Sequence, residues 1–144
     1  MNTVSWSNTI DSSFQINPNP TYRCILIKKW WLADSFLESF IRRTSGLELT
    51  WSGAYSAEAL STLQTGSYDL VFASLPSPEM AVPESILSEL RKQKALIISA
   101  SYPEYLFSGY RLDPLYFLKE PFPPANLQRA LEKFKDIAYC RKSA

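Results

Sequence analysis

The sequence contains no histidine among its 144 residues. Histidine is the commonest general base, the commonest metal ligand and the usual proton carrier of a nucleophilic triad. Its absence leaves acid–base catalysis with few candidates, and no pair of carboxylates lies at the end of an expected strand. We therefore expect that the protein is not an enzyme.

Glycine and cysteine are also scarce. The four glycines form no G-x-G-x-x-G arrangement, so a phosphate-cradling loop is not indicated. Cys24 and Cys140 lie far apart and have no metal-ligand spacing, and we expect both to be free thiols. The sequence has no secretory apolar region and no apolar run long enough for a membrane helix. These absences predict a cytoplasmic protein without metal, cofactor or membrane contact.

The charges are almost balanced, with 15 basic and 14 acidic residues and a net charge of +1. This balance argues against a basic face that binds nucleic acid directly. The length suits one domain with a sizeable apolar core. Residues 1–21 are rich in Ser, Thr, Asn and Pro and show no period, so we interpret them as a partly flexible N-terminal extension to a domain at 22–140. Trp6 and Phe14 leave a docking role open.

Apolar runs of strand type alternate five times with helical patterns. The expected strands are 22–27, 47–55, 68–74, 95–100 and 114–119, and the expected helices are 30–46, 57–66, 82–93, 103–112 and 123–142. In the first helix, the spacing predicts Leu32, Phe36, Phe40 and Ile41 on the buried face. The alternation predicts an α/β fold with a doubly wound parallel sheet.

Two stretches carry a resemblance to a known family. LVFASLPSPEM, residues 70–80, and ISASYPEYLFSGYRLDPLYFLKEPF, residues 98–122, resemble the receiver domain of two-component response regulators, in particular the LytR/AlgR type. The resemblance covers most of the chain. It implies a CheY-like, flavodoxin-like (βα)5 sheet with strand order 2-1-3-4-5 and a role in phosphorelay signal transduction.

The chemistry of that family is not carried over with the scaffold. Receivers transfer a phosphoryl group from a histidine kinase to an aspartate with the help of Mg²⁺. The resemblance places the family's acidic pair on Lys28 and Lys29 and the accepting aspartate on Ser74. The family's threonine falls on Ala100, between two serines, and its lysine falls on Glu120.

These replacements remove both the metal site and the acceptor. Mg²⁺ takes hard oxygen ligands, which two ammonium groups do not supply, and Ser74 has no carboxylate to phosphorylate. We therefore interpret the chain as an atypical receiver that works without phosphorylation. The swapped charges leave two alternatives, an ion pair of Lys28 or Lys29 with Glu120, or solvent exposure of all three.

The resemblance also implies an output face and an unusual backbone. Four aromatic residues of the expected fourth helix and fifth strand fall on the family's dimerisation face, and we expect a protein partner or a homodimer there, through helix 4, strand 5 and helix 5; they are Tyr105, Tyr110, Tyr116 and Phe117. The family's Lys-Pro bond is usually cis, so we expect a cis bond at Glu120–Pro121, with Phe122 packed inward.

Two further alternatives stay open. Trp30 and Trp31 either pack over the first helix and the old pocket or form an aromatic lid on a binding site. The second function class is a small-ligand-binding regulatory module that uses the crevice at the carboxyl ends of the strands. There, anions or nucleotides would meet the lysines and the loop at 74–77.

Overall fold

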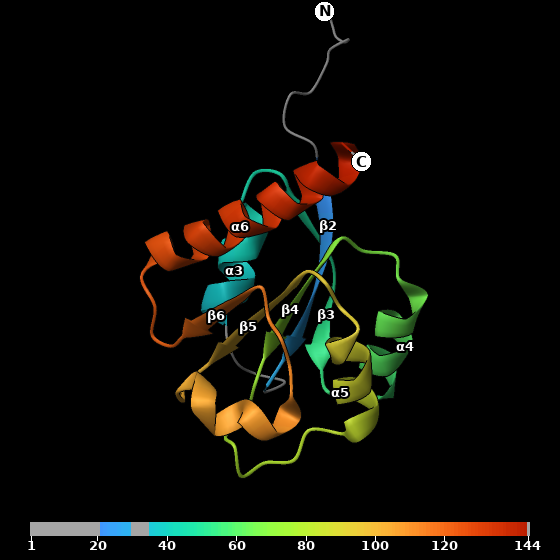
Figure 1. The fold of residues 1–144 in the computed structure, drawn as a ribbon, viewed down its shortest axis with the longest axis vertical. Coiled ribbons are helices and arrows are strands. Elements are labelled where there is room, and N and C mark those ends of the chain that lie inside the picture. Colours follow the sequence, from blue (N-terminus) through green and yellow to red (C-terminus); the bar gives the residue numbers. More distant parts are fainter. Residues whose placement is uncertain (1–20, 30–34, 144) are drawn as a thin grey trace, which may run out of the picture.

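The computed structural model describes residues 21–29 and 35–143, with side chains to residue 138, so the expected N-terminal extension, Trp30 and Trp31 lie outside the described residues. The chain alternates strands and helices as the sequence predicts (Figure 1). The elements are β2 (Tyr22–Lys28), α3 (Ser35–Arg43), β3 (Leu47–Ala54), α4 (Ala57–Thr65), β4 (Leu70–Ser74), α5 (Glu84–Arg91), β5 (Leu96–Ala100), η1 (Glu104–Tyr110), β6 (Tyr116–Lys119) and α6 (Pro124–Ser143).

The five strands form one parallel sheet in the order β3-β2-β4-β5-β6. Counted along the chain this is the order 2-1-3-4-5, and the flavodoxin-like prediction is confirmed. The strand expected at 47–55 lies at an edge of the sheet, because β3 pairs with β2 alone within the described chain. All the strands run in the same direction, so their carboxyl ends meet at one edge of the sheet.

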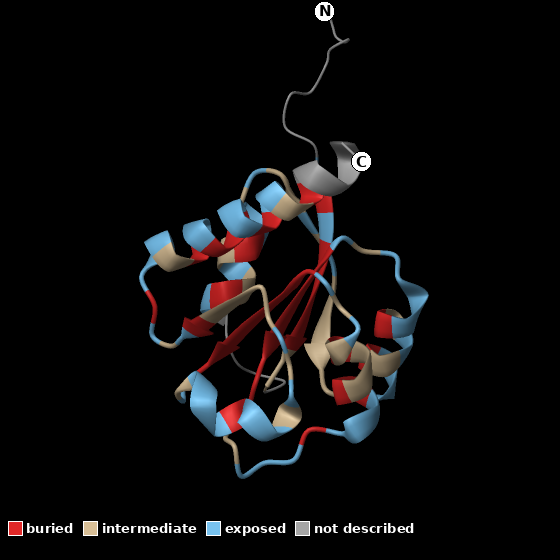
Figure 2. Ribbon diagram, viewed as in Figure 1, coloured by how far each residue is buried: buried red, intermediate tan, exposed pale blue. Residues whose placement is uncertain are grey.

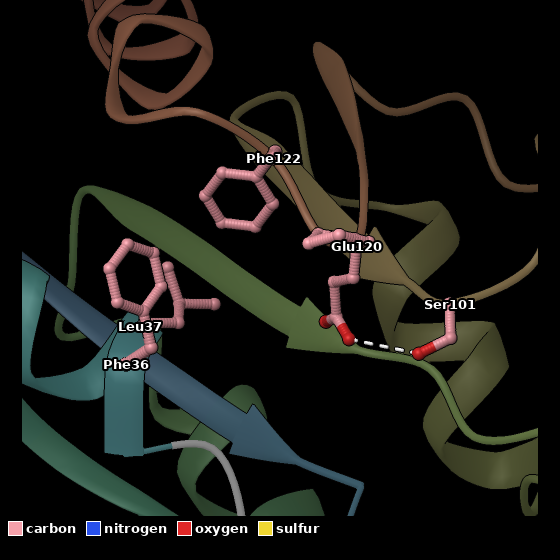
Figure 3. Close-up of a pocket in the computed structure, with 6 residues that line it drawn as sticks. Phe36, Leu37, Ser101, Glu120 and Phe122 are labelled. Atoms are coloured by element: carbon pink, nitrogen blue, oxygen red, sulfur yellow. Dashed lines mark hydrogen bonds between the residues drawn. The ribbon is translucent and has the colours of Figure 1, made fainter.

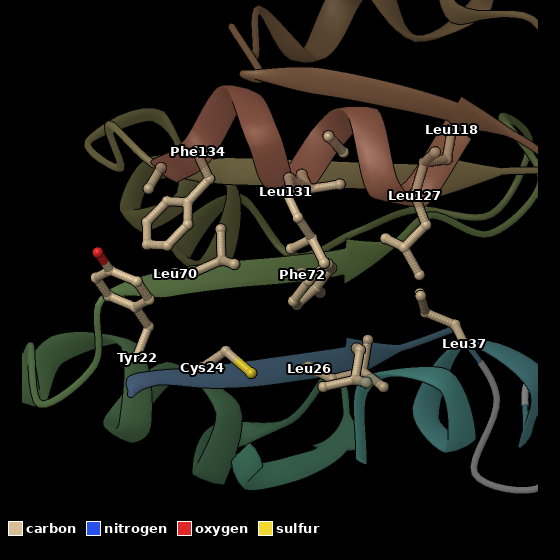
Figure 4. Packing of buried hydrophobic residues seen from close by; sticks show 14 of the residues in the cluster. Tyr22, Cys24, Leu26, Leu37, Leu70, Phe72, Leu118, Leu127, Leu131 and Phe134 are labelled. Carbon is tan, nitrogen blue, oxygen red and sulfur yellow. The ribbon is translucent and has the colours of Figure 1, made fainter. Parts of the chain in front are cut away.

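Helices cover both faces of the sheet. The first core cluster lies between the sheet and helices α3 and α6, and the second lies between the sheet and α4, α5 and η1. Figure 2 shows the middle strands buried along their length, as expected for a sheet covered on both sides. In the first cluster, Phe134 of α6 meets Tyr22 edge to face with ring centroids 4.9 Å apart (Figure 4).

The ends of α4 follow the local chemistry of the sequence. The Ser56 hydroxyl accepts a hydrogen bond from the backbone N–H of Ala59 at 3.2 Å, which satisfies one of the free donors of the first turn. Gly66 ends the helix in the left-handed region with a φ of 69°. The bounds agree with the helix expected at 57–66.

The predicted buried face of the first helix is partly wrong. Leu37 and Ile41 face the core, whereas Phe36 is 48% exposed and Phe40 is half-buried. The four apolar residues occupy two adjacent rows of the helix, and the spacing alone does not say which row faces the sheet. Leu32 lies outside the described residues.

The predicted fourth helix is a 3₁₀ helix, η1, instead of an α-helix. Its seven residues contain a kink at Phe107, whose φ is −106°, and Phe107 is the residue of η1 that the core buries. A segment of this length forms few hydrogen bonds as an α-helix and buries little apolar surface, so the α-helical form is hardly favoured over the 3₁₀ form.

Candidate functional site

The residues that the resemblance assigns to the phosphorylation pocket converge at the carboxyl edge of the sheet. Lys28 and Lys29 stand at the end of β2, Ser74 ends β4, and Ala100 ends β5. Glu120 follows β6, and its backbone N–H donates to the carbonyl of Ala100 at 2.7 Å, so the β5–β6 pairing continues to this residue. The predicted cis bond between Glu120 and Pro121 is confirmed.

Lys29 and Glu120 form the centre of a polar cluster. The Lys29 Nζ lies 2.6 Å from Glu120 Oε1, and the side chains are only 12% and 21% exposed. The Ser101 hydroxyl donates to the same carboxylate oxygen at 3.0 Å (Figure 3) and accepts from Lys29 Nζ at 3.3 Å. Of the alternatives left open by the sequence, the ion pair between Lys29 and Glu120 is confirmed.

Lys28 takes a different partner. Its Nζ donates to Glu38 Oε1 of α3 at 3.0 Å, while Arg42 and the Ser52 hydroxyl each donate to Oε2 at 2.9 Å. Burial alone would raise the pKa of Glu38, but the hydrogen bonds from Arg42, Lys28 and Ser52 outweigh it and lower the pKa from its ordinary 4.5. The expected alternative of a Lys28–Glu120 pair is therefore wrong. The sequence reasoning missed Glu38, although Arg42 four residues on is a typical helical ion-pair signal.

The acceptor position is closed and neutral. Ser74 is fully buried, and its hydroxyl lies 2.9 Å from the hydroxyl of Ser99, its register partner on β5. Ala100 is also buried and brings only a methyl group. Ser99, whose hydroxyl contacts that of Ser74, lies one residue before the position assigned to the family's threonine.

Tyr55 holds the chain where β4 ends. Its hydroxyl donates to the carbonyl of Ser74 at 3.0 Å, and the backbone N–H of Leu75 donates to the carbonyl of Ser99 at 2.8 Å. Burial, with a smaller contribution from Tyr110, raises the pKa of Tyr55. The sequence reasoning missed this contact, for which the only available signal is the place of Tyr55 directly after a strand.

Comparisons with known proteins agree with this architecture. No family model matches the chain. Over 115 residues it is 22% identical to the sensory transduction protein LytT of Bacillus anthracis, an overlap of 78% of this chain and 47% of the relative. The chain thus spans about half the length of the curated relatives it matches.

Two solved structures are similar over nearly their whole lengths. The response regulatory domain of mrkE from Klebsiella pneumoniae matches with a TM-score of 0.62 and 16% identity, covering 80% of this chain and 96% of that one. The receiver domain of AraT, a response regulator from Geobacillus stearothermophilus, matches with a TM-score of 0.63 and 18% identity, covering 85% and 98%. The chain has the response-regulator receiver fold. Within this receiver fold, the cluster of Lys29, Ser101 and Glu120 lies at the edge where the resemblance places the phosphorylation pocket.

The aromatic residues assigned to the output face of the receiver fold are not equally accessible. Tyr105 is 73% exposed, whereas Tyr110, Tyr116 and Phe117 are half-buried. The Tyr110 hydroxyl donates to the carbonyl of Met80 at 3.3 Å, and the ring of Phe117 packs 6.3 Å from that of Phe107. The exposed aromatic surface therefore centres on Tyr105.

Three smaller results complete the site. No group of three or more His, Cys, Asp or Glu residues within 21–29 and 35–143 could hold a metal ion. None of the helices described is both long and apolar enough to cross a membrane. Cys24 is a free thiol as predicted, and burial raises its pKa to about 12, while the side chain of Cys140 lies outside the described residues.

Proposed function

We propose that this receiver-like domain acts by protein–protein contact and does not accept a phosphoryl group. The observation that carries the proposal is the ion pair of Lys29 and Glu120, which occupies the edge of the sheet where a receiver would hold its metal and phosphoryl group. On this view the domain is neither an enzyme nor a phosphorelay partner. It is a regulatory module with a fixed pocket.

The charges at this edge support the proposal. A divalent cation would approach two ammonium groups, and the carboxylates of Glu38 and Glu120 are already neutralised by bonded cations. An incoming phosphoryl donor would find at Ser74 a hydroxyl that is buried and bonded to Ser99. Neither component of phosphoryl transfer then has a place to bind.

We assign the protein contact to the surface around Tyr105. Tyr102 and Leu106 beside it are 41% and 45% exposed, so three large side chains share a short stretch of η1 and the loop before it. The two tyrosines supply rigid apolar contact area with a polar hydroxyl at the tip, which is typical of interfaces, and Leu106 adds apolar area. The occupant is a partner protein or a second copy of this chain, and no direct contact with nucleic acid is proposed.

The experiment is incubation with acetyl phosphate, or with beryllofluoride, in the presence of Mg²⁺. We expect no labelled side chain by intact-mass analysis and no saturable Mg²⁺-dependent change in the NMR spectrum. RcsB from Salmonella, whose structure was solved with the phosphomimetic beryllofluoride, serves as the positive control. A stable label on any aspartate, or a saturable Mg²⁺-dependent change, would contradict the proposal.

A matched variant sharpens this test. The combined substitutions Lys28→Asp, Lys29→Asp, Ser74→Asp and Glu120→Lys restore the charges that the family resemblance implies. If the closed pocket is the only obstacle, the folded variant should respond to Mg²⁺ and beryllofluoride where the wild type does not. Circular dichroism establishes that the variant is folded before the comparison is made.

One observation favours the second candidate function, a ligand-binding module, but with a ligand other than an anion. The lysines that were expected to meet an anion are both in ion pairs, so an anionic ligand loses its expected partners. An apolar pocket does, however, lie directly beside Glu120.

A further inference from the structure

A pocket of about 580 Å³ lies between α3 and the turn that follows β6. Its volume falls within the roughly 300–1,000 Å³ of pockets that bind small molecules. Figure 3 shows the side chains around it, with α3 on one side and the end of β6 on the other. It is lined by Phe36, Leu37, Ser101, Glu120, Pro121 and Phe122.

One side of the pocket is an aromatic wall. The rings of Phe36 and Phe122 meet edge to face with their centroids 5.8 Å apart. Phe122 is buried as predicted, whereas Phe36 leaves almost half of its surface in water. A large apolar side chain that stays exposed beside a cavity gains if a ligand covers it.

The opposite side of the pocket carries one unused acceptor. Lys29 and Ser101 both donate to Oε1 of Glu120. Among the residues described, no hydrogen bond is made to Oε2, and in Figure 3 the second carboxylate oxygen is turned toward the side of Phe36 and Leu37. A carboxylate oxygen in partly apolar surroundings is a strong acceptor for an N–H or O–H group.

The local charges decide the charge of the ligand. Around Glu120 and Glu38, the described residues place three bonded cations against two carboxylates, namely Lys28, Lys29 and Arg42. A further cation would meet a net positive charge, and an anion would meet the open carboxylate oxygen. A neutral molecule avoids both costs.

We propose that this pocket binds a small, neutral aromatic molecule that carries one N–H or O–H donor. The ring packs against Phe36 and Phe122, and the donor bonds to Oε2 of Glu120. This gives the second candidate function a ligand class. It does not depend on whether the domain is phosphorylated.

The test uses two matched pairs of probes in NMR titrations of the wild-type chain, without Mg²⁺ or phosphodonor. The pairs are 2-naphthol with 2-methoxynaphthalene, and indole with 1-methylindole, which differ in the donor while keeping the ring. We expect saturable shifts at Phe36 and Phe122 with 2-naphthol and indole. The methylated probes should bind about tenfold more weakly, which corresponds to about 1.4 kcal/mol.

Variants separate this pocket from unspecific binding. Phe36→Ala removes an exposed side chain, should leave the fold intact, and should weaken both donor probes about tenfold. Ser39→Ala, on the exposed face of the same helix, should bind as the wild type does. Titrations without saturable shifts at the pocket overturn the proposal, as do methylated probes that bind equally well or an unchanged affinity in Phe36→Ala. The phosphorylation test has its own readout, so either proposal can fail alone.

Discussion

The centre and the flank of the sheet's carboxyl edge are held together by different kinds of contact. At the centre, on β4 and β5, two serine hydroxyls face each other in a buried and neutral contact. At the flank, beyond β2 and β6, full charges remain, and each carboxylate is bonded to at least one cation. The centre is defined by strand register, and the flank is defined by side chains that reach across the edge.

This difference predicts that substitutions at the centre and at the flank change the free energy of unfolding by different amounts. A new charge at the centre would be buried, because Ser74 and Ser99 are shielded from water, so its desolvation is costly. The removal of one charge at the flank leaves its partner unpaired but partly in contact with water, which costs less. The following substitutions test this ranking.

The largest effect should come from Ser74→Asp alone. The new carboxylate would be buried beside Ser99, and we expect a loss of about 3 kcal/mol in the free energy of unfolding at neutral pH. The loss should shrink in acid, because a protonated carboxyl avoids the cost of a buried charge. Urea denaturation measures it against Ser74→Ala, and a loss equal to that of the alanine variant would mean that water or a cation reaches the centre.

The ion pair should give the next effect. Glu120→Gln leaves the largely buried ammonium of Lys29 without its counter-ion, and we expect a loss of about 1–2 kcal/mol. A double-mutant cycle with Lys29→Met isolates the pairwise energy from the packing of the two side chains. If the two losses simply add, the pair contributes no coupling and the flank is not held by its charges.

Substitution of Glu38 should have a smaller effect on the free energy of unfolding, and this effect should depend on pH. Its pKa in the folded state is lowered by the bonds from Lys28, Arg42 and Ser52, although burial opposes them. Its stabilising contribution is therefore present above the ordinary pKa of 4.5 and is lost as the pH falls through the lowered value. Glu38→Gln should cost about 1 kcal/mol at neutral pH and nearly nothing in acid, by thermal unfolding across the pH range. A pH-independent difference would assign the effect to packing.

The smallest effect on stability should come from Tyr105→Ala, on the exposed surface of η1. We expect a change below about 0.5 kcal/mol, because the side chain is mostly in water. The same substitution should abolish association with the partner or with a second copy, measured by sedimentation. The exposed Gln64→Ala on α4 serves as the control, and unchanged association in Tyr105→Ala would remove η1 from the proposed interface.

The sequence predicts the scaffold better than it predicts the side-chain contacts. Strands β4 and β5 are apolar except for one serine each, which indicates interior strands, and the serine and glycine at the ends of α4 mark its bounds by local chemistry. The family positions, which parallel strands bring to one edge, placed Lys28, Lys29 and Glu120 near one another and left a pair with Glu120 as one of two alternatives, and the structure shows it for Lys29. These predictions depend on the periodicity of apolar residues and on strand topology, both of which can be read from the sequence.

The missed contacts depend on helix rotation and side-chain direction. The rotation of α3 decides that Leu37 faces the core, and the same rotation brings Glu38 to Lys28. Neighbouring lysines at a strand end alternate in direction, so only one could reach Glu120. Ser74 contacts Ser99 because the register of β4 and β5 places these two residues side by side. A register shifted by one residue would give Ser74 a different neighbour.

The contact of Tyr55 with the carbonyl of Ser74 has a consequence for alkaline solutions. Because the folded state raises the pKa of this phenol, the folded chain keeps its proton after an ordinary tyrosine, with a pKa of 10.0, has ionised. The unfolded chain then holds fewer protons than the folded one, so stability falls as the pH rises above that value. The ionisation of Tyr55 should therefore accompany alkaline unfolding of the sheet instead of preceding it.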